Sequence, residues 1–240
     1  TTRGELLVFG GDEVYPTASF RDYKERLTSL YDAVFPKRKS AATTDENRPS
    51  PVLFAIPGNH DWYDSLVAFS DIFCSGKSFA GWQTKQNRSY FAIKLPRGWR
   101  LFGTDMQLGS SLDKAQIQYF SRVMNFVGPD DRIILCNAEP HWITAKMYED
   151  EPAYNNRNMG YFEGAVLKRQ VAVFVAGDRH YYRRHEEISN YSKKIDPESR
   201  SKVQKMVAGG GGAFLHPTHK ENVDVIGKRH IFELRESFPE

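Results

Sequence analysis

The sequence predicts an α/β fold in which β-sheets and helices form layers. Three observations predict it. Short apolar runs bounded by glycine, proline or polar residues recur along the chain, several of them are apolar throughout, and segments of helical periodicity separate them. Continuously apolar runs are typical of strands buried on both faces. Strands that alternate with helices indicate a layered α/β architecture.

The expected strands, in order, lie at 5–11, 51–58, 89–96, 99–105, 132–140, 171–178, 202–212 and 229–236. The expected helices lie at 19–35, 64–73 and 112–127. The first helix has one apolar stripe, made of Phe20, Tyr23, Leu27, Leu30, Tyr31 and Val34, and Ser110 or Ser111 should cap the last helix. The polar segments 36–51 and 189–202 are expected to be exposed loops. Because similar strands resume after both loops, 1–240 is expected to form a single domain.

The composition is that of a soluble globular protein, with 40% hydrophobic and 26% charged residues. The 33 basic and 30 acidic residues are too balanced to indicate a nucleic-acid partner. No apolar stretch reaches the roughly 18 residues of a membrane span, and the first residues lack the features of a signal peptide. Cys74 and Cys136 lack metal-ligand spacing, so packed thiols in a reducing compartment are expected, which favours the cytoplasm.

Four of the expected strands end in polar residues that are able to bind a metal ion: Asp12, then Asn59 and His60, then Glu139, then Asp178 and His180. In α/β sheets, ligands gather at the carboxyl ends of strands, so these loops are expected to converge. Carboxylates, an amide oxygen and imidazoles suit divalent Mn, Fe or Zn. Two such ions can bind the oxygens of a phosphate and lower the pKa of a water to about 7. Phosphoester hydrolysis is therefore the first reaction to expect.

Each of these residues also has a simpler structural interpretation. Asp12 alone would suit a helix or turn cap, and Gly58-Asn59 would suit a turn with Asn in the left-handed region. Glu139 could be a surface carboxylate, and Asp178 could be a capping one. The metal interpretation rests on their joint occurrence at strand ends.

The blocks "GGDEVY", "GNHD", "CNAEP" and "GDRH", the last followed by a Gly-rich strand end, resemble in order the motifs of the calcineurin-like metallophosphoesterases. The resemblance runs from Gly10 to about Gly212. It implies two facing mixed β-sheets flanked by helices, and hydrolysis of a phosphomonoester or phosphodiester by a metal-bound hydroxide. The implied cofactors are two divalent or mixed-valence ions of Mn, Fe or Zn, and the implied substrate is a phosphorylated small molecule or protein.

The resemblance also implies a role for each metal ligand. Asp12 would bridge the two ions, Asn59 would bind the second ion, and His180 would bind the first. Tyr15, three residues after Asp12, matches the tyrosine that purple acid phosphatases place on their iron, although such a tyrosine can also simply pack with its hydroxyl at the surface. In this assignment the ligands come from loops far apart in the sequence.

Further residues are implied to act on the substrate or beside it. His60 would contact the phosphate or assist the leaving group, and Asp61 would orient His60 or a metal-bound water, or else cap the turn. Three arginines, Arg179, Arg183 and Arg184, could steer an anion or form a solvated edge. The stretch "GGGGAFLHPTH" could offer backbone N–H groups to a phosphate or form a tight turn, with His216 and His219 at the rim of the site or in an exposed loop.

The sequence departs from the family pattern in three places. The first Asp-containing block is absent, so the chain is expected to be a fragment that lacks its first strand. Glu139 stands where the family has His, with His141 as the fallback, and Asp178 replaces the first His of Gly-His-x-His. Two carboxylates in place of imidazoles would favour Mn or Mg over Zn. These departures keep open a non-catalytic binding or scaffolding domain, whereas a nuclease would need a basic, aromatic-lined groove that the sequence does not locate.

Overall fold

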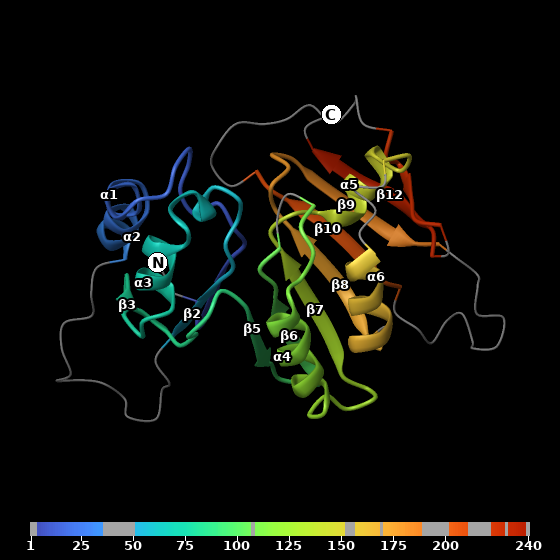
Figure 1. The fold of residues 1–240 in the computed structure, drawn as a ribbon, viewed down its shortest axis with the longest axis horizontal. Coiled ribbons are helices and arrows are strands. Elements are labelled where there is room, and N and C mark those ends of the chain that lie inside the picture. Colours follow the sequence, from blue (N-terminus) through green and yellow to red (C-terminus); the bar gives the residue numbers. More distant parts are fainter. Residues whose placement is uncertain are drawn as a thin grey trace. The chain divides into compact units, whose positions relative to one another are not determined.

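The structure is a computed structural model that describes residues 4–35, 51–106, 109–151, 157–168, 170–188, 202–210, 222–228 and 230–238. The chain divides into two compact units, unit 1 from Thr1 to Phe91 and unit 2 from Ala92 to Glu240. Each unit contains a mixed sheet with helices beside it, which confirms the predicted α/β class (Figure 1). Most of the two expected loops, together with His216 and His219, lies outside the described residues.

The sheet of unit 1 has the strand order β1-β2-β4-β3. The parallel strands β1 (Leu6–Phe9) and β2 (Val52–Ala55) are neighbours, and β2 is also parallel to β4 (Trp82–Thr84). Strand β3 (Ser78–Phe79) runs antiparallel to β4. The sequence does not predict β3 and β4, because two or three residues are too few to show a period.

The first expected helix forms, but a π-helical turn interrupts it. It consists of α1 (Phe20–Tyr23), the π-helical turn η1 (Lys24–Thr28) and α2 (Ser29–Val34). Ser19 caps it by accepting a hydrogen bond from the Asp22 N–H at 3.1 Å. A π-turn contains more residues than an α-turn, so it rotates the later residues away from the expected stripe. Tyr23 and Leu27 are buried, whereas Phe20, Leu30 and Val34 are exposed.

The second helix of unit 1 begins later than expected. A short 3-10 turn, η2 (Asp61–Asp64), comes first, and α3 spans Val67–Phe73. The Asp64 carboxylate holds the start of α3 by accepting from the N–H groups of Val67 and Ala68, at 3.0 and 2.9 Å. In the core of unit 1, the Phe9 ring packs edge-to-face against the rings of Tyr31, Phe73 and Phe79, with centroids 5.5 to 5.9 Å apart.

The sheet of unit 2 has the strand order β11-β12-β9-β10-β8-β7-β6-β5 (Figure 1). Its strands are β5 (Phe91–Lys94), β6 (Trp99–Gly103), β7 (Arg132–Asn137), β8 (Val171–Ala176), β9 (Tyr182–Glu187), β10 (Gln204–Ala208), β11 (Val225–Ile226) and β12 (Phe232–Phe238). Strands β6, β7, β8 and β10 are mutually parallel, so their carboxyl ends lie at one edge of the sheet. Strand β9 is not among the strands expected from the sequence, because its residues YRRHEE contain no apolar run.

Three helical segments belong to unit 2. Helix α4 (Lys114–Met124) is capped by Asp113, which accepts the Gln116 N–H at 2.7 Å, so the expected capping serines were wrong. Helix α5 (His141–Met147), and α6 (Arg157–Tyr161) with the π-turn η4 (Phe162–Val166), were not expected. The Phe120 ring of α4 packs 5.4 Å from Phe102 on β6 and 5.2 Å from Phe162 on η4, measured between centroids. None of the helices in the described residues is long and apolar enough to cross a membrane.

Candidate active site

Two loops of unit 1, after β1 and β2, carry the candidate residues Asp12, Tyr15, Asn59 and His60. Because β1 and β2 are adjacent and parallel, both loops leave the same edge of the sheet. The Asp12 carboxylate joins the loops, because its Oδ1 accepts the backbone N–H of His60 at 2.9 Å. The Asn59 side-chain amide makes no hydrogen bond to any of the described residues. In unit 1 the Asp12 carboxylate thus contacts the backbone of the loop that carries Asn59 and His60, and the joint action of the three side chains stays a prediction.

Gly58 is required at the place where the two loops touch. A Cβ atom at this position would lie 2.1 Å from Asp12 Oδ1 and 2.5 Å from the Asp12 backbone nitrogen. The sequence suggests a turn at Gly58-Asn59, but glycine is needed here because Asp12 approaches so closely. Asp12 itself has a φ of +54°, in the left-handed region that costs energy for residues with a side chain.

Asp61 holds the backbone of both loops. It is fully buried, and its Oδ2 accepts the N–H groups of Gly58 and Asp12, each at 2.8 Å, while its Oδ1 accepts the Tyr23 hydroxyl. None of these contacts is to the His60 ring, so they do not favour a role for Asp61 in orienting that ring. They make Asp61 a positioning residue for the two loops.

The His60 ring is oriented by a backbone carbonyl. Its Nδ1 lies 2.6 Å from the carbonyl oxygen of Pro16, which can only accept, so Nδ1 carries a proton. The ring also packs between Tyr15 and Tyr63, with centroids 4.4 and 4.9 Å away. With Nδ1 engaged, Nε2 is the nitrogen with which His60 can donate or accept a proton. Tyr15 is thus a packing partner of His60, and its hydroxyl as an iron ligand stays a prediction.

A buried acidic cluster below these loops was not found from the sequence. Burial, and next the nearby Asp61 carboxylate, raise the pKa of Glu13 well above its ordinary value. Burial, and next the charges of Glu13 and Asp61, also raise the pKa of Tyr23, whose hydroxyl therefore stays protonated and donates to Asp61. The adjacent acidic pair in "GGDE" was the available signal, whereas Tyr23 looked like an ordinary core aromatic.

Two loops of unit 2, after β7 and β8, carry the candidate residues Glu139, Asp178, Arg179 and His180. The backbone joins them, because the Gly177 N–H donates to the Ala138 carbonyl at 3.0 Å. Asp178 has a φ of +58°, so it shares with Asp12 the left-handed conformation. Gly209, at the end of β10, completes the arrangement, because a Cβ there would lie 1.9 Å from the Arg179 carbonyl oxygen. The Gly209 N–H donates to the Tyr181 carbonyl, at 3.1 Å.

Glu139 is buried and bonded on both carboxylate oxygens. Oε1 accepts the Thr144 hydroxyl at 2.7 Å, and Oε2 accepts the backbone N–H of Gly109. These bonds tie the start of α5 to the loop after β6. The interpretation as a surface carboxylate is thus wrong, and the role of Glu139 as a metal ligand stays a prediction.

His141, the fallback ligand, is built into a buried hydrogen-bond chain. The Asn137 amide donates to His141 Nδ1 at 3.2 Å, and His141 Nε2 lies 2.8 Å from Glu163 Oε1. The Thr104 hydroxyl in turn donates to Asn137 Oδ1 at 2.6 Å. Both ring nitrogens of His141 are therefore occupied inside unit 2, which argues against a ligand role.

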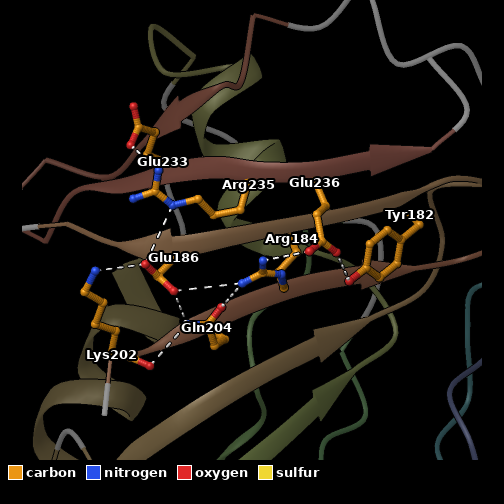
Figure 2. A network of polar contacts seen from close by, with 8 residues as sticks. All are labelled: Tyr182, Arg184, Glu186, Lys202, Gln204, Glu233, Arg235 and Glu236. Carbon is orange, nitrogen blue, oxygen red and sulfur yellow. Dashed lines mark hydrogen bonds and ion pairs between the residues drawn. The ribbon is translucent and has the colours of Figure 1, made fainter. Parts of the chain in front are cut away.

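The three arginines that could steer an anion have different surroundings. Arg179 Nε lies 3.8 Å from Asp178 Oδ2. Arg184 faces an outer network in which it bonds to Glu236 at 2.8 Å and to Gln204 at 3.0 Å (Figure 2). Arg183, one residue away on β9, is buried on the other face of the sheet and lies 5.0 Å from the Tyr181 ring centroid. The solvated-edge interpretation therefore suits Arg184.

The donor types of the two loop pairs, carboxylate, amide and imidazole, fit divalent metal ions. Among the described residues, however, no three side chains of His, Cys, Asp or Glu gather closely enough to hold one. These residues therefore match a divalent metal ion in the chemical type of their donor groups.

Comparison with known proteins gives matches to solved structures but no family. No family model matches the chain, and no curated protein was found to match it. Among solved structures, the chain is similar to a purple acid phosphatase isolated from yellow lupin (Lupinus luteus) seeds, with 14% sequence identity and a TM-score of 0.49. The match covers 76% of this chain and 34% of the phosphatase chain, so this chain spans about a third of that chain's length.

Proposed function

We propose that this protein is a metal-dependent phosphoesterase, which hydrolyses a phosphomonoester or phosphodiester of a small molecule or protein. The observation that carries the proposal is the junction of the two loops in unit 1. Asp12 accepts the His60 N–H, Gly58 leaves no room for any other residue, and Asp61 fixes both backbones. The left-handed conformation of Asp12 costs energy, and such strained residues cluster at functional sites, which supports a joint role for Asp12, Asn59 and His60.

The proposed metal ligands are the six residues Asp12, Tyr15, Asn59, Glu139, Asp178 and His180. Asp12 would bridge two ions, with Asn59, Glu139 and Asp178 on one of them, and with His180 and Tyr15 on the other. When bound, Mn, Fe or Zn ions at such a site polarise phosphoryl oxygens and lower the pKa of a water. The left-handed conformation shared by Asp12 and Asp178 supports the assignment, because strained residues cluster at functional sites.

The proposed role of His60 follows from its fixed ring. Because Nδ1 donates to the Pro16 carbonyl, Nε2 is the nitrogen left for the substrate; in the doubly protonated ring it would donate a hydrogen bond to a phosphoryl oxygen or a proton to the leaving group. Asp61 would act through the backbone of the loops, as a positioning residue. Arg179, with His216 and His219, is proposed to contact the anionic substrate.

The test is hydrolysis of p-nitrophenyl phosphate by the chain supplied with Mn²⁺ or Zn²⁺, together with its metal content. We expect Asn59→Ala to lose metal affinity and activity together. We expect His60→Ala to keep the metal and to lose about 10²-fold in kcat, the scale of one transition-state contact. His230→Ala is the matched control, because His230 is an exposed imidazole that pairs with Glu187 at 2.8 Å. Loss of metal binding in His60→Ala would contradict the separation of roles.

A non-catalytic binding domain is the second candidate, and one observation favours it. The ring nitrogens of His141 and the carboxylate oxygens of Glu139 already have partners within unit 2. Such a domain would bind a phosphorylated partner without turnover. Protein that stays metal-free without chelators, and is inactive with every added metal, would favour this candidate over the enzyme.

A further inference from the structure

Lys205 occupies a position in the sheet of unit 2 where an apolar side chain is expected. Residues directly opposite one another on neighbouring strands share one face of a sheet. The cross-strand row that contains Lys205 runs through Phe102, Leu135, Phe174, Lys205, His185 and Leu234. Within this row, Phe102 packs against Phe120 of α4, and Phe174 packs against Trp142 of α5, so the lysine stands in a row of core residues.

The Lys205 ammonium group lies among aromatic rings. Its Nζ is 4.7 Å from the ring centroids of Phe174 and Phe232, and 5.5 Å from that of Trp142. Rings at this distance stabilise a cation but do not neutralise it. Among the described residues, no carboxylate lies within ion-pair distance of Nζ, and no group accepts a hydrogen bond from it. Burial lowers the pKa of Lys205, and the more distant charges of Glu163 and Glu187 oppose this shift.

The Lys205 side chain lines a cavity of about 290 Å³ within unit 2. One wall is apolar, with Trp142, Met159 and Ile226, and Glu163 and Lys228 also line the cavity. This volume is at the lower end of the range of small-molecule sites. An apolar wall beside the Lys205 ammonium group fits a ligand with an apolar body and one anionic group.

The charges of the lining residues indicate how much negative charge the ligand can carry. Lys146 is neutralised by Glu149, because its Nζ lies 3.2 Å from both carboxylate oxygens. Glu163 is bonded to His141 and stays close to the cavity as an anion. It would repel a dianion such as a phosphate monoester more than a carboxylate. The positive charges of Lys205 and Lys228 and the negative charge of Glu163 remain. Their sum is one positive charge, which a ligand with a single negative charge would balance.

We propose that this cavity is a binding site for a small organic monocarboxylate, whose carboxylate pairs with the Lys205 ammonium while its apolar part lies against Trp142, Met159 and Ile226. The missing counter-ion of this half-buried lysine is then the ligand itself. The site uses none of the proposed metal ligands, so it goes beyond the proposed phosphoesterase function. Its test does not depend on turnover.

The experiment uses benzoate as the probe on the full chain, followed by isothermal titration and by the NMR signal of the Trp142 indole N–H. We expect a Kd of about 1 mM, reasonable for a ligand of this size. Lys205→Met keeps the shape of the side chain but removes its charge, and should weaken benzoate binding at least about tenfold. Lys202→Met is the matched control, because Lys202 lies outside the cavity and pairs with Glu186 at 2.9 Å; it should bind benzoate normally.

A probe series on the unmodified chain decides the proposal even if Lys205→Met fails to fold. Benzyl alcohol, benzylamine and phenyl phosphate have similar rings and differ in charge. We expect all three to bind more weakly than benzoate. Equal or tighter binding of any of them, read at the Trp142 indole N–H signal and not from total heat, would overturn the assignment to a monocarboxylate, because Trp142 lines this cavity and not the proposed phosphoesterase site. Unchanged benzoate binding in folded Lys205→Met, or no benzoate binding at about 20 mM, would overturn it as well.

Discussion

The two loop pairs that carry the candidate ligands are fastened in different ways. In unit 1, the Asp12 carboxylate itself joins the loops by accepting the His60 N–H. In unit 2, the backbone bond from Gly177 to Ala138 joins the loops, and the Asp178 side chain takes no part in that bond. Asp12 is thus both a candidate metal ligand and the residue that joins its two loops, whereas Asp178 is a candidate ligand that does not join its loops. Substitution of Asp12 should therefore affect stability and function together, whereas substitution of Asp178 should affect function alone.

The largest expected effects come from the two glycines at the loop contacts. Gly58→Ala and Gly209→Ala should each destabilise the protein by about 3 kcal/mol, because the new Cβ would overlap backbone or carboxylate atoms. Gly10→Ala is the matched control, since no atom lies within 4 Å of its added Cβ. Chemical denaturation measures all three. A small effect of either contact substitution, equal to that of Gly10→Ala, would mean that the loop contact in that unit is loose.

The next effect compares two buried carboxylates. Asp61→Ala should cost about 2 kcal/mol, because it leaves the backbone N–H groups of Gly58 and Asp12 without their acceptor. It should also lower activity by displacing Asp12. Glu139→Ala leaves the Gly109 N–H and the Thr144 hydroxyl unsatisfied, and should cost a similar amount. Asp61→Asn, which keeps one oxygen, should recover part of the loss. Denaturation curves that show no recovery would argue for a role of the charge itself.

A pH-dependent effect is expected in unit 2. Burial by itself raises the pKa of Glu163, but the hydrogen bond from His141 and the charges of His141, Lys205 and His230 outweigh it, so the pKa lies below its ordinary value. The unfolded chain then binds more protons in acid. The stabilisation from this carboxylate is present above the unfolded pKa of about 4.3 and is lost as the pH falls through the lower folded value.

Glu163→Gln should therefore be less stable than the natural chain at pH 7, by about 1 kcal/mol, and the difference should shrink towards pH 3. Thermal unfolding across this pH range measures it. A difference that stays constant with pH would show that shape, not charge, is what Glu163 contributes. In unit 1 the situation is reversed, because burial and the nearby Asp61 carboxylate raise the pKa of Glu13 above its ordinary value.

The smallest expected effect on stability is at Asp178, where function alone should change. Asp178→His should leave stability within about 0.5 kcal/mol, since His tolerates the left-handed region better than most residues. If Asp178 binds metal, the replacement should shift the preferred metal from Mn towards Zn, because imidazole suits Zn. Hydrolysis of an aryl phosphate across a metal series measures this preference. An unchanged ranking of the metals would exclude Asp178 as a ligand.

The sequence predicts the α/β class and the strands before the candidate loops, because those strands are apolar and end in glycine or proline. It does not predict β9, because the charged residues of this strand alternate between the outer network and the buried face. The period of two is present, but both halves are polar, so hydropathy carries no signal. The π-turn at Lys24–Thr28 is also invisible to a pattern of fixed period.

Within the candidate site, the sequence locates the residues but not what holds them. The grouping of Asp12 with Asn59 and His60 follows from adjacent parallel strands, which can be expected from the apolar runs. The hydrogen bond from the Tyr23 hydroxyl to Asp61 could not be expected, because it depends on the tertiary packing of α1. The two hydrogen bonds that the Glu139 carboxylate accepts come from Gly109 and Thr144, and no sequence motif marks either residue.

The contact between His60 Nδ1 and the Pro16 carbonyl has a spectroscopic consequence. It holds the neutral ring as the Nδ1–H tautomer, the opposite of the form that free histidine prefers in water. In a ¹⁵N spectrum, the His60 Nδ1 should therefore have the chemical shift of a protonated, pyrrole-type nitrogen, and Nε2 that of an unprotonated, pyridine-type nitrogen. A single side-chain signal thus reports, without substrate or metal, whether the loop after β1 is in place.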